Sequence, residues 1–78
     1  MNCHTGYKLD VTPMKQLTTN DTDDCILECI DTINCVSLNV EHIDQTSVDC
    51  SLLSTDRHRN NENFTIATGM EHCAIMVK

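Results

Sequence analysis

The most reactive residues in this chain of 78 residues are its six cysteines. They span almost the whole length, at Cys3, Cys25, Cys29, Cys35, Cys50 and Cys73. Cysteines in such numbers either oxidise in pairs or bind a metal ion. An even number at high density in a short chain is typical of secreted domains whose hydrophobic core is too small to hold the fold alone. The sequence therefore favours a disulfide framework, although the count alone leaves the pairing open.

Zinc is the main chemical alternative. If the two ends of the chain met, a Cys2His2 ligand set would form from Cys3, His4, His72 and Cys73. However, the chain contains no Cys-x2-Cys pair, and its spacings match no zinc finger. We therefore expect no metal ion and no other cofactor.

Catalysis also has weak support in the sequence. Ser37, His42 and Asp44 supply the residue types of a hydrolytic triad, but no nucleophile elbow or oxyanion-hole motif surrounds them. The acidic run at 21–24 lacks the glycine and the closing glutamate of an EF-hand loop. If all the cysteines pair, none remains as a nucleophile. We therefore expect no catalytic residues.

Charge and length restrict the partners and the organisation. The formal charge is -7, from twelve acidic residues against five lysines and arginines, which disfavours nucleic acid, heparin and anionic lipid. No apolar run approaches the ~20 residues that cross a bilayer, so no membrane insertion is expected. The length suits a single domain over residues 1–78. Because no secretion signal follows Met1, we expect a domain excised from a larger extracellular protein.

The clearest expected element is a helix over residues 22–33. Its apolar residues recur at offsets of three and four, which predicts one shared face: Cys25, Ile26, Cys29, Ile30 and Ile33. Acidic residues crowd its start, where the helix dipole favours negative charge. The candidate N-caps are Asn20, Asp21 and Thr22, and Asn34 is the expected stop.

The rest of the chain predicts β-structure. Alternating or continuous apolar residues indicate strands at 36–40, 49–54, 64–68 and 73–77, with edge strands at 7–11 and 14–18. Pro13 separates the two edge strands. The polar stretch 54–63 is expected to be an exposed loop.

The order of the cysteines resembles that of a known family. Cys25-x3-Cys29-x5-Cys35 is followed by Ser37-Leu38-Asn39-Val40 and then by Cys50-Ser51-Leu52, with Cys3 and Cys73 outside. This pattern resembles the PAN/apple domain family, which includes the amino-terminal domains of plasminogen and hepatocyte growth factor and the apple domains of plasma prekallikrein. The resemblance covers nearly the whole chain, and residues 24–53 are its most specific part.

This resemblance implies a small disulfide-rich α+β fold, in which a curved antiparallel β-sheet wraps around a single α-helix. It also implies a nested pairing: Cys3–Cys73, Cys25–Cys50 and Cys29–Cys35. The pairing is compatible with the expected helix, because Cys25 and Cys29 would lie on the same face one turn apart.

The same resemblance implies a non-catalytic binding module that is secreted or part of an ectodomain. We expect it to mediate protein–protein interaction, because the chain has only two aromatic residues, Tyr7 and Phe64, to stack on sugar rings. Carbohydrate (glycan) binding is the second hypothesis. A structural spacer or component of the extracellular matrix is the third.

Two sequons identify candidate N-glycosylation sites. They are Asn20-Asp21-Thr22 and Asn63-Phe64-Thr65, and both lie in polar segments, as a secretory route requires. The candidate modified residues are therefore Asn20 and Asn63.

A loop rich in hydrogen-bond donors is the candidate ligand-contact segment. It consists of Arg57, His58, Arg59, Asn60 and Asn61. Such side chains can bind a carboxylate, a sulfate or a sugar. Two nearby arginines are too few to hold heparin against the negative net charge, so heparin binding is not expected.

Overall fold

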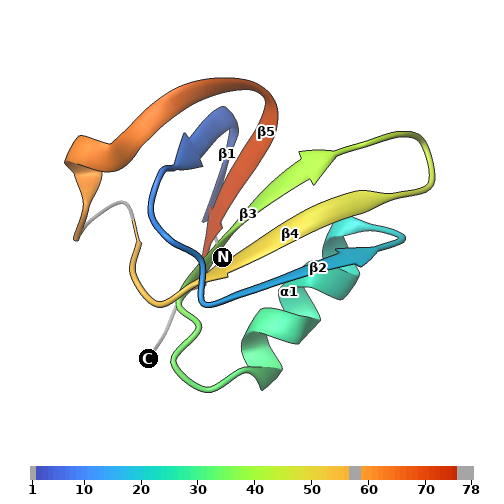
Figure 1. Cartoon of the computed structure of the whole chain (residues 1–78), viewed down its shortest axis with the longest axis horizontal. Coiled ribbons are helices and arrows are strands. Elements are labelled where there is room, and N and C mark those ends of the chain that lie inside the picture. The colour runs from blue at the N-terminus through green and yellow to red at the C-terminus, as the bar shows by residue number, and fades with distance from the viewer. Residues whose placement is uncertain (1, 57–58, 76–78) are drawn as a thin grey trace.

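A five-stranded antiparallel sheet and one α-helix make up the regular structure of the described residues, 2–56 and 59–75, in this computed structural model (Figure 1). The strand order is β1-β5-β3-β4-β2. The strands are β1 (Asn2–Leu9), β2 (Lys15–Thr19), β3 (Ser37–His42), β4 (Val48–Leu53) and β5 (Phe64–Ala74). The helix α1 (Thr22–Asp31) follows β2, and a short 3-10 helix η1 (Asn61–Asn63) precedes β5. No described helix is long and apolar enough to cross a membrane.

Most of these elements agree with the expected ones to within a few residues, but β1 and β5 do not. The sequence predicts two strands, at 64–68 and 73–77, whereas the structure has one continuous strand from Phe64 to Ala74. Gly69 lies in the intervening stretch with φ of 86°, a left-handed conformation that glycine adopts without strain. Residues 69–72 therefore belong to the strand and bend it, and do not separate two strands.

The bend in β5 comes from a large bulge against β1. Thr5 pairs with Glu71 and Tyr7 pairs with Ile66, so that Gly6 alone lies opposite residues 67–70 of β5. Extra residues on one strand increase its local bend and twist. As a result β5 arches over, and β1 follows it beneath the arch, while β3, β4 and β2 continue as a flatter sheet (Figure 1). The strand expected at 7–11 therefore begins earlier and ends at Leu9.

Helix α1 begins at an acidic cap. Among the three candidates, Asp21 is the N-cap, and its Oδ1 accepts a hydrogen bond from the backbone N–H of Asp24 at 2.9 Å. The helix ends at Asp31, where the N–H of Thr32 donates to the carbonyl of Cys29 at 3.1 Å. Asn34 has φ of 72° and turns the chain towards β3 just after the end of the helix.

We expect the substitution Asp21→Ala to lower the free energy of unfolding by about 1 kcal/mol, because it removes the acceptor for a backbone N–H that has no partner within the helix. Asp21→Asn is the matched control, since its side-chain oxygen can still cap. Urea denaturation of the two variants measures the difference. Equal losses in both would mean that the negative charge, and not the hydrogen bond, stabilises this end.

The main core lies between α1 and one face of the sheet. Its buried residues come from the helix and from the three strands β3, β4 and β5: Cys25, Cys29, Leu38, Val40, Val48, Cys50, Leu52 and Cys73. Only part of the expected apolar helix face is buried. Ile26 packs against this core, but Ile30 is 59% exposed and Ile33 is 83% exposed. A single short helix on a sheet buries only a narrow stripe, and here Cys25 and Cys29 occupy it.

A second group of buried residues lies on the opposite face of the sheet, under the β1–β5 arch. It contains both apolar and polar side chains: Leu9, Ser37, Asn39, Leu53, His72 and Ala74. Asn39 is only 6% exposed, and both the oxygen and the nitrogen of its side-chain amide form hydrogen bonds. Its Oδ1 accepts from the Leu9 N–H at 3.0 Å, and its Nδ2 donates to the Leu9 carbonyl at 2.8 Å.

This amide also fixes the tautomer of His72. The two bonds to Leu9 leave Oδ1 of Asn39 facing Nδ1 of His72, 2.9 Å away. An amide oxygen can only accept, so the His72 Nδ1 carries the hydrogen. Asn39 thus joins β3 to β5 and to the end of β1, although β1 and β3 are not neighbours in the sheet.

The disulfides join these parts in the pairs that the resemblance implied. Cys25 of α1 bonds to Cys50 of β4, with 5.9 Å between the Cα atoms. Cys29–Cys35 ties the last turn of the helix to the segment that enters β3, with a Cα distance of 5.3 Å. The third pair, Cys3–Cys73, joins directly opposed residues of β1 and β5.

Candidate functional site

The candidate site is the sheet face that α1 leaves uncovered. Because side chains alternate along a strand, every second residue of β2, β4, β3 and β5 points to this face. In the observed register they form two rows across the sheet. The first row is Gln16, Ser51, Asn39 and His72, and the second is Thr18, Asp49, Glu41 and Met70.

The outer part of this face is hollowed into a groove with a volume of about 310 Å³. The open-face side chains that line it are Gln16, Thr18, Glu41, Asp49, Ser51 and Met70. Hydroxyl, amide and carboxylate groups are therefore gathered around one methionine. We call these six residues the sheet groove.

The electrostatics of the sheet groove are negative. Glu41 of β3 lies directly opposite Asp49 of β4, and both side chains are exposed. The Thr18 hydroxyl donates to Oδ1 of Asp49 at 2.6 Å, which orients that carboxylate. Two residues before Thr18 in β2, the Nε2 of Gln16 lies 3.4 Å from the Ser51 hydroxyl oxygen. No lysine or arginine of the described residues lines the groove.

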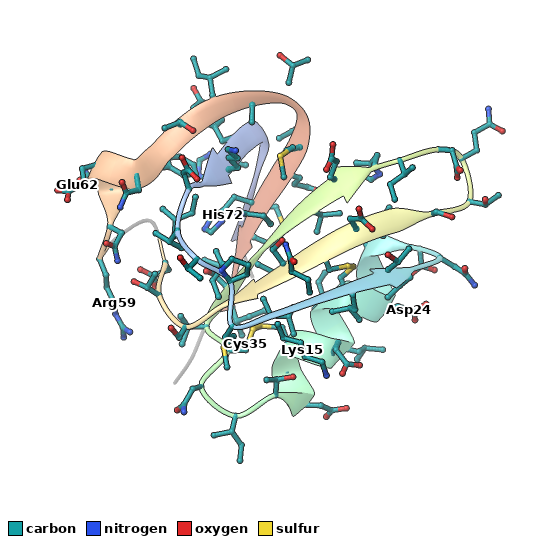
Figure 2. All side chains as sticks on the ribbon, in the orientation of Figure 1. Lys15, Asp24, Cys35, Arg59, Glu62 and His72 are labelled. Carbon is teal, nitrogen blue, oxygen red and sulfur yellow. A yellow bond between two sulfur atoms is a disulfide. The ribbon has the colours of Figure 1, made fainter. Side chains whose placement is uncertain are left out.

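The nearest lysine in sequence points elsewhere. Lys15 precedes Gln16 in β2, so its side chain lies on the helix side of the sheet, where its Nζ is 2.8 Å from Oε2 of Glu28 in α1 (Figure 2). Both side chains are substantially exposed, so this ion pair contributes little to stability. Because Lys15 points to the helix side, the carboxylates of the sheet groove have no neutralising cation among the described residues.

The aromatic rings lie beside the sheet groove but not in it. Tyr7 of β1 stacks on Phe64 of β5, with ring centroids 5.0 Å apart and an interplanar angle of 14°. His4 and His72 both meet Phe64 edge-on, at 5.7 Å and 5.5 Å. The rings are packed on one another under the arch. They therefore offer no flat platform to a ligand in the groove.

The four residues of the hypothetical zinc site are not assembled. Cys3 faces Cys73 and His4 faces His72 on adjacent positions of the β1–β5 pair, so the cysteines and the histidines point to opposite faces. Among the described residues, the one group of three potential ligands is Cys3, Glu71 and Cys73, with ligand atoms within 4.8 Å of one another. Its two sulfur atoms form a disulfide and are not available as thiolates.

The residues of the hypothetical triad are also apart. Ser37 and His42 stand at the two ends of β3 and on opposite faces, and the Ser37 hydroxyl donates to the carbonyl of Thr55. The carboxylate of Asp44 accepts hydrogen bonds from the backbone N–H and the hydroxyl of Thr46, at 2.8 and 3.0 Å. These bonds hold the pKa of Asp44 below its usual value. The three residues therefore have separate structural surroundings.

The candidate glycosylation sites differ in exposure. Asn20 is exposed in the turn between β2 and α1, directly before the helix cap. Asn63 is half-buried at the end of η1, and its carbonyl accepts a hydrogen bond from the Asp10 N–H at 2.8 Å. Asn20 is thus the better placed of the two for a glycan.

The donor-rich loop is described only in part. Arg57 and His58 lie outside the described residues. Arg59 is exposed, as Figure 2 shows, and Asn61 is exposed in η1. The amide of Asn60 donates to the Thr55 hydroxyl at 2.6 Å, so it supports the loop itself.

The sequence did not single out the sheet groove. Alternation in 36–40 and 49–54 assigns Glu41, Asp49 and Ser51 to the polar side of their strands. It does not reveal that β3 lies between β4 and β5, or that β2 adds Gln16 and Thr18 at the edge. Comparison of the chain with models of protein families, with curated proteins and with solved structures gave no match.

Proposed function

We propose that this protein is a non-catalytic extracellular binding module of the PAN/apple type, which binds another protein through the sheet groove. The order of the cysteines, the three disulfides and the α+β architecture support this proposal. Disulfides persist in secreted proteins and ectodomains, which supports an extracellular location.

The observation that carries the proposal is the pairing of Glu41 with Asp49 in a hollow surface. Like charges directly opposite on neighbouring strands destabilise a sheet. A ligand cation between them would offset that repulsion and gain two charge-assisted hydrogen bonds. The chemistry that fits is the ammonium or guanidinium group of a lysine or arginine side chain, with its aliphatic stem against Met70.

Carbohydrate binding is the second candidate. The amide of Gln16 and the hydroxyl of Ser51 can bind sugar hydroxyls, and carboxylates can accept from them. Sugar binding normally adds an aromatic face, but Tyr7 and Phe64 stack on each other outside the groove. A protein ligand therefore fits better. A structural spacer would use no groove at all.

Chemical-shift mapping with short peptides tests this assignment. Peptides with a central lysine or arginine should shift the backbone amides of Glu41, Asp49 and Ser51, whereas a peptide with central glutamine should not. The variant Glu41→Gln/Asp49→Asn should lose these shifts, because it keeps the shape of both side chains and removes their charge. The matched control is Asp10→Asn/Glu62→Gln, which removes the same charge from exposed positions outside the groove.

The other outcomes are equally informative. Shifts confined to other surfaces, or unchanged shifts in the groove variant, would contradict the proposed site. Binding on a glycan array, with no chemical-shift changes from the peptides, would favour carbohydrate binding. No binding in either assay, together with self-association in light scattering, would favour the role of a structural spacer.

A further inference from the structure

The surface of α1 that faces away from the sheet carries an exposed aliphatic ridge. Leu27 is 58% exposed and Ile30 is 59% exposed, and their spacing of three residues makes them neighbours on the helix surface. Ile33, 83% exposed, follows immediately after the helix. We call these three residues the helix ridge. Aliphatic side chains in this position contribute little to the core, which α1 reaches through Cys25 and Cys29.

Acidic side chains surround the helix ridge. The residues four and three positions before Leu27 are Asp23 and Asp24, and the residue four positions after it is Asp31. All three are exposed. Within residues 2–56 and 59–75 the salt bridge of the helix joins Lys15 to Glu28, so these three carboxylates have no cationic partner there. The surface is thus an apolar centre with an acidic rim.

We propose that the helix ridge is a second docking surface, for a protein partner that presents aliphatic side chains flanked by lysine or arginine. An apolar centre with a charged rim is the usual composition of a protein interface, and complementary charge on the partner speeds association and selects it. Asp23, Asp24 and Asp31 of the rim have no cationic partner among the described residues, so the complementary partner is basic.

A second copy of this chain does not fit the same surface. A symmetric dimer would place the ridge of one chain against that of the other, because such an interface uses the same patch twice. Three carboxylates from each chain would then meet, and each chain already carries a formal charge of -7. The occupant is therefore a different protein.

The helix ridge and the sheet groove lie on opposite faces of the sheet. Helix α1 packs against β2, β3 and β4 from one side, and the groove residues of these strands point to the other. Occupation of one surface leaves the other open. The module can therefore bridge two basic partners, which goes beyond the single contact proposed for the groove.

A designed peptide provides the probe. It is an amphipathic helical peptide with leucines on one face and lysines on the other, compared with a peptide of the same leucines and glutamines. Fluorescence anisotropy with the intact chain should show tighter binding of the lysine peptide, weakened by added salt. The variant Leu27→Gln/Ile30→Gln should weaken this binding by about tenfold, since it removes the apolar centre.

Two control variants separate this surface from other effects. Ile66 is an isoleucine of β5 that is 77% exposed, and Ile66→Gln should leave binding unchanged. Because the lysine peptide can also reach the sheet groove, the Leu27→Gln/Ile30→Gln change is measured again in the groove variant Glu41→Gln/Asp49→Asn, where the loss of about tenfold should persist, so that failure at one surface does not decide the other. Because both ridge positions are exposed, circular dichroism should show a folded Leu27→Gln/Ile30→Gln variant.

Three results would overturn the proposal. Equal affinity of the lysine peptide for the wild-type chain and the ridge variant would mean that general charge attraction, and not the apolar centre, accounts for the binding. Equal affinity for both peptides would remove the role of the acidic rim. A dimer in light scattering that the ridge variant dissolves would identify a second copy as the occupant.

Discussion

Replacing Cys25 and Cys50 together by alanine will destabilise the protein more than replacing Cys3 and Cys73, with a loss of about 3–5 kcal/mol. Chain entropy by itself predicts the reverse order. The terminal disulfide spans 70 residues and the other spans 25, which favours the terminal pair by about 1 kcal/mol. The structure gives the reason for our order, because Cys25 and Cys50 are 0% and 1% exposed in the main core.

Removal of the Cys25–Cys50 bridge has two consequences. It frees α1 from β4, and it leaves a void where two buried sulfur atoms packed. In the terminal pair only Cys73 is buried in this core, whereas Cys3 is exposed at the start of β1. Guanidinium denaturation of the two double variants measures both losses. A larger loss for Cys3→Ala/Cys73→Ala would show that closure of the chain, and not the packing of α1, dominates stability.

We expect Asn39→Leu to lower the free energy of unfolding by about 3 kcal/mol. Leucine branches at the same carbon as asparagine, but it leaves the Leu9 N–H, the Leu9 carbonyl and the His72 Nδ1 hydrogen without their acceptor or donor. Each buried polar group that loses its partner costs about 1–3 kcal/mol, and relaxation of the end of β1 lets water satisfy part of this loss. Thermal or urea unfolding measures the effect.

An exposed asparagine provides the control for this substitution. Asn61→Leu changes the same side chain at an exposed position of η1 and should leave stability nearly unchanged. Hydrogen exchange adds a local readout, since the Leu9 amide should lose protection first in Asn39→Leu. A stable variant with a protected Leu9 amide would mean that the arch holds β1 in place without the Asn39 amide.

Local patterns in the sequence determined much of the fold. Acidic and capping residues at 20–24 located the start of α1 because a helix start favours negative charge and side-chain acceptors. Alternation in 36–40 and 49–54 located β3 and β4 because side chains of a strand point alternately to two faces. The order of the cysteines implied the disulfide pairs through the family resemblance, which spacing alone does not provide.

The exposure of Ile30 was not evident from the shared helix face and the gap in β5 was predicted wrongly, for the same physical reason. Both depend on what lies next to the segment, and a local pattern does not contain that information. The helix offered five apolar residues, but the neighbouring sheet and the two helix disulfides selected Cys25 and Cys29 as the buried stripe. The sequence left residues 69–72 between two strands, but pairing with β1 through a bulge kept them in one bent strand.

The sequence by itself determined that this is a small acidic α+β domain held by disulfides, because those properties follow from residue types and local spacing. Only the tertiary structure decided which residues come together in the two proposed binding surfaces. Glu41 and Asp49 face each other because β3 pairs with β4, and Asn39 reaches Leu9 because β5 arches. The helix ridge is exposed because α1 turns its cysteines to the sheet. Each of these contacts joins residues distant in sequence, so strand order and register decide them.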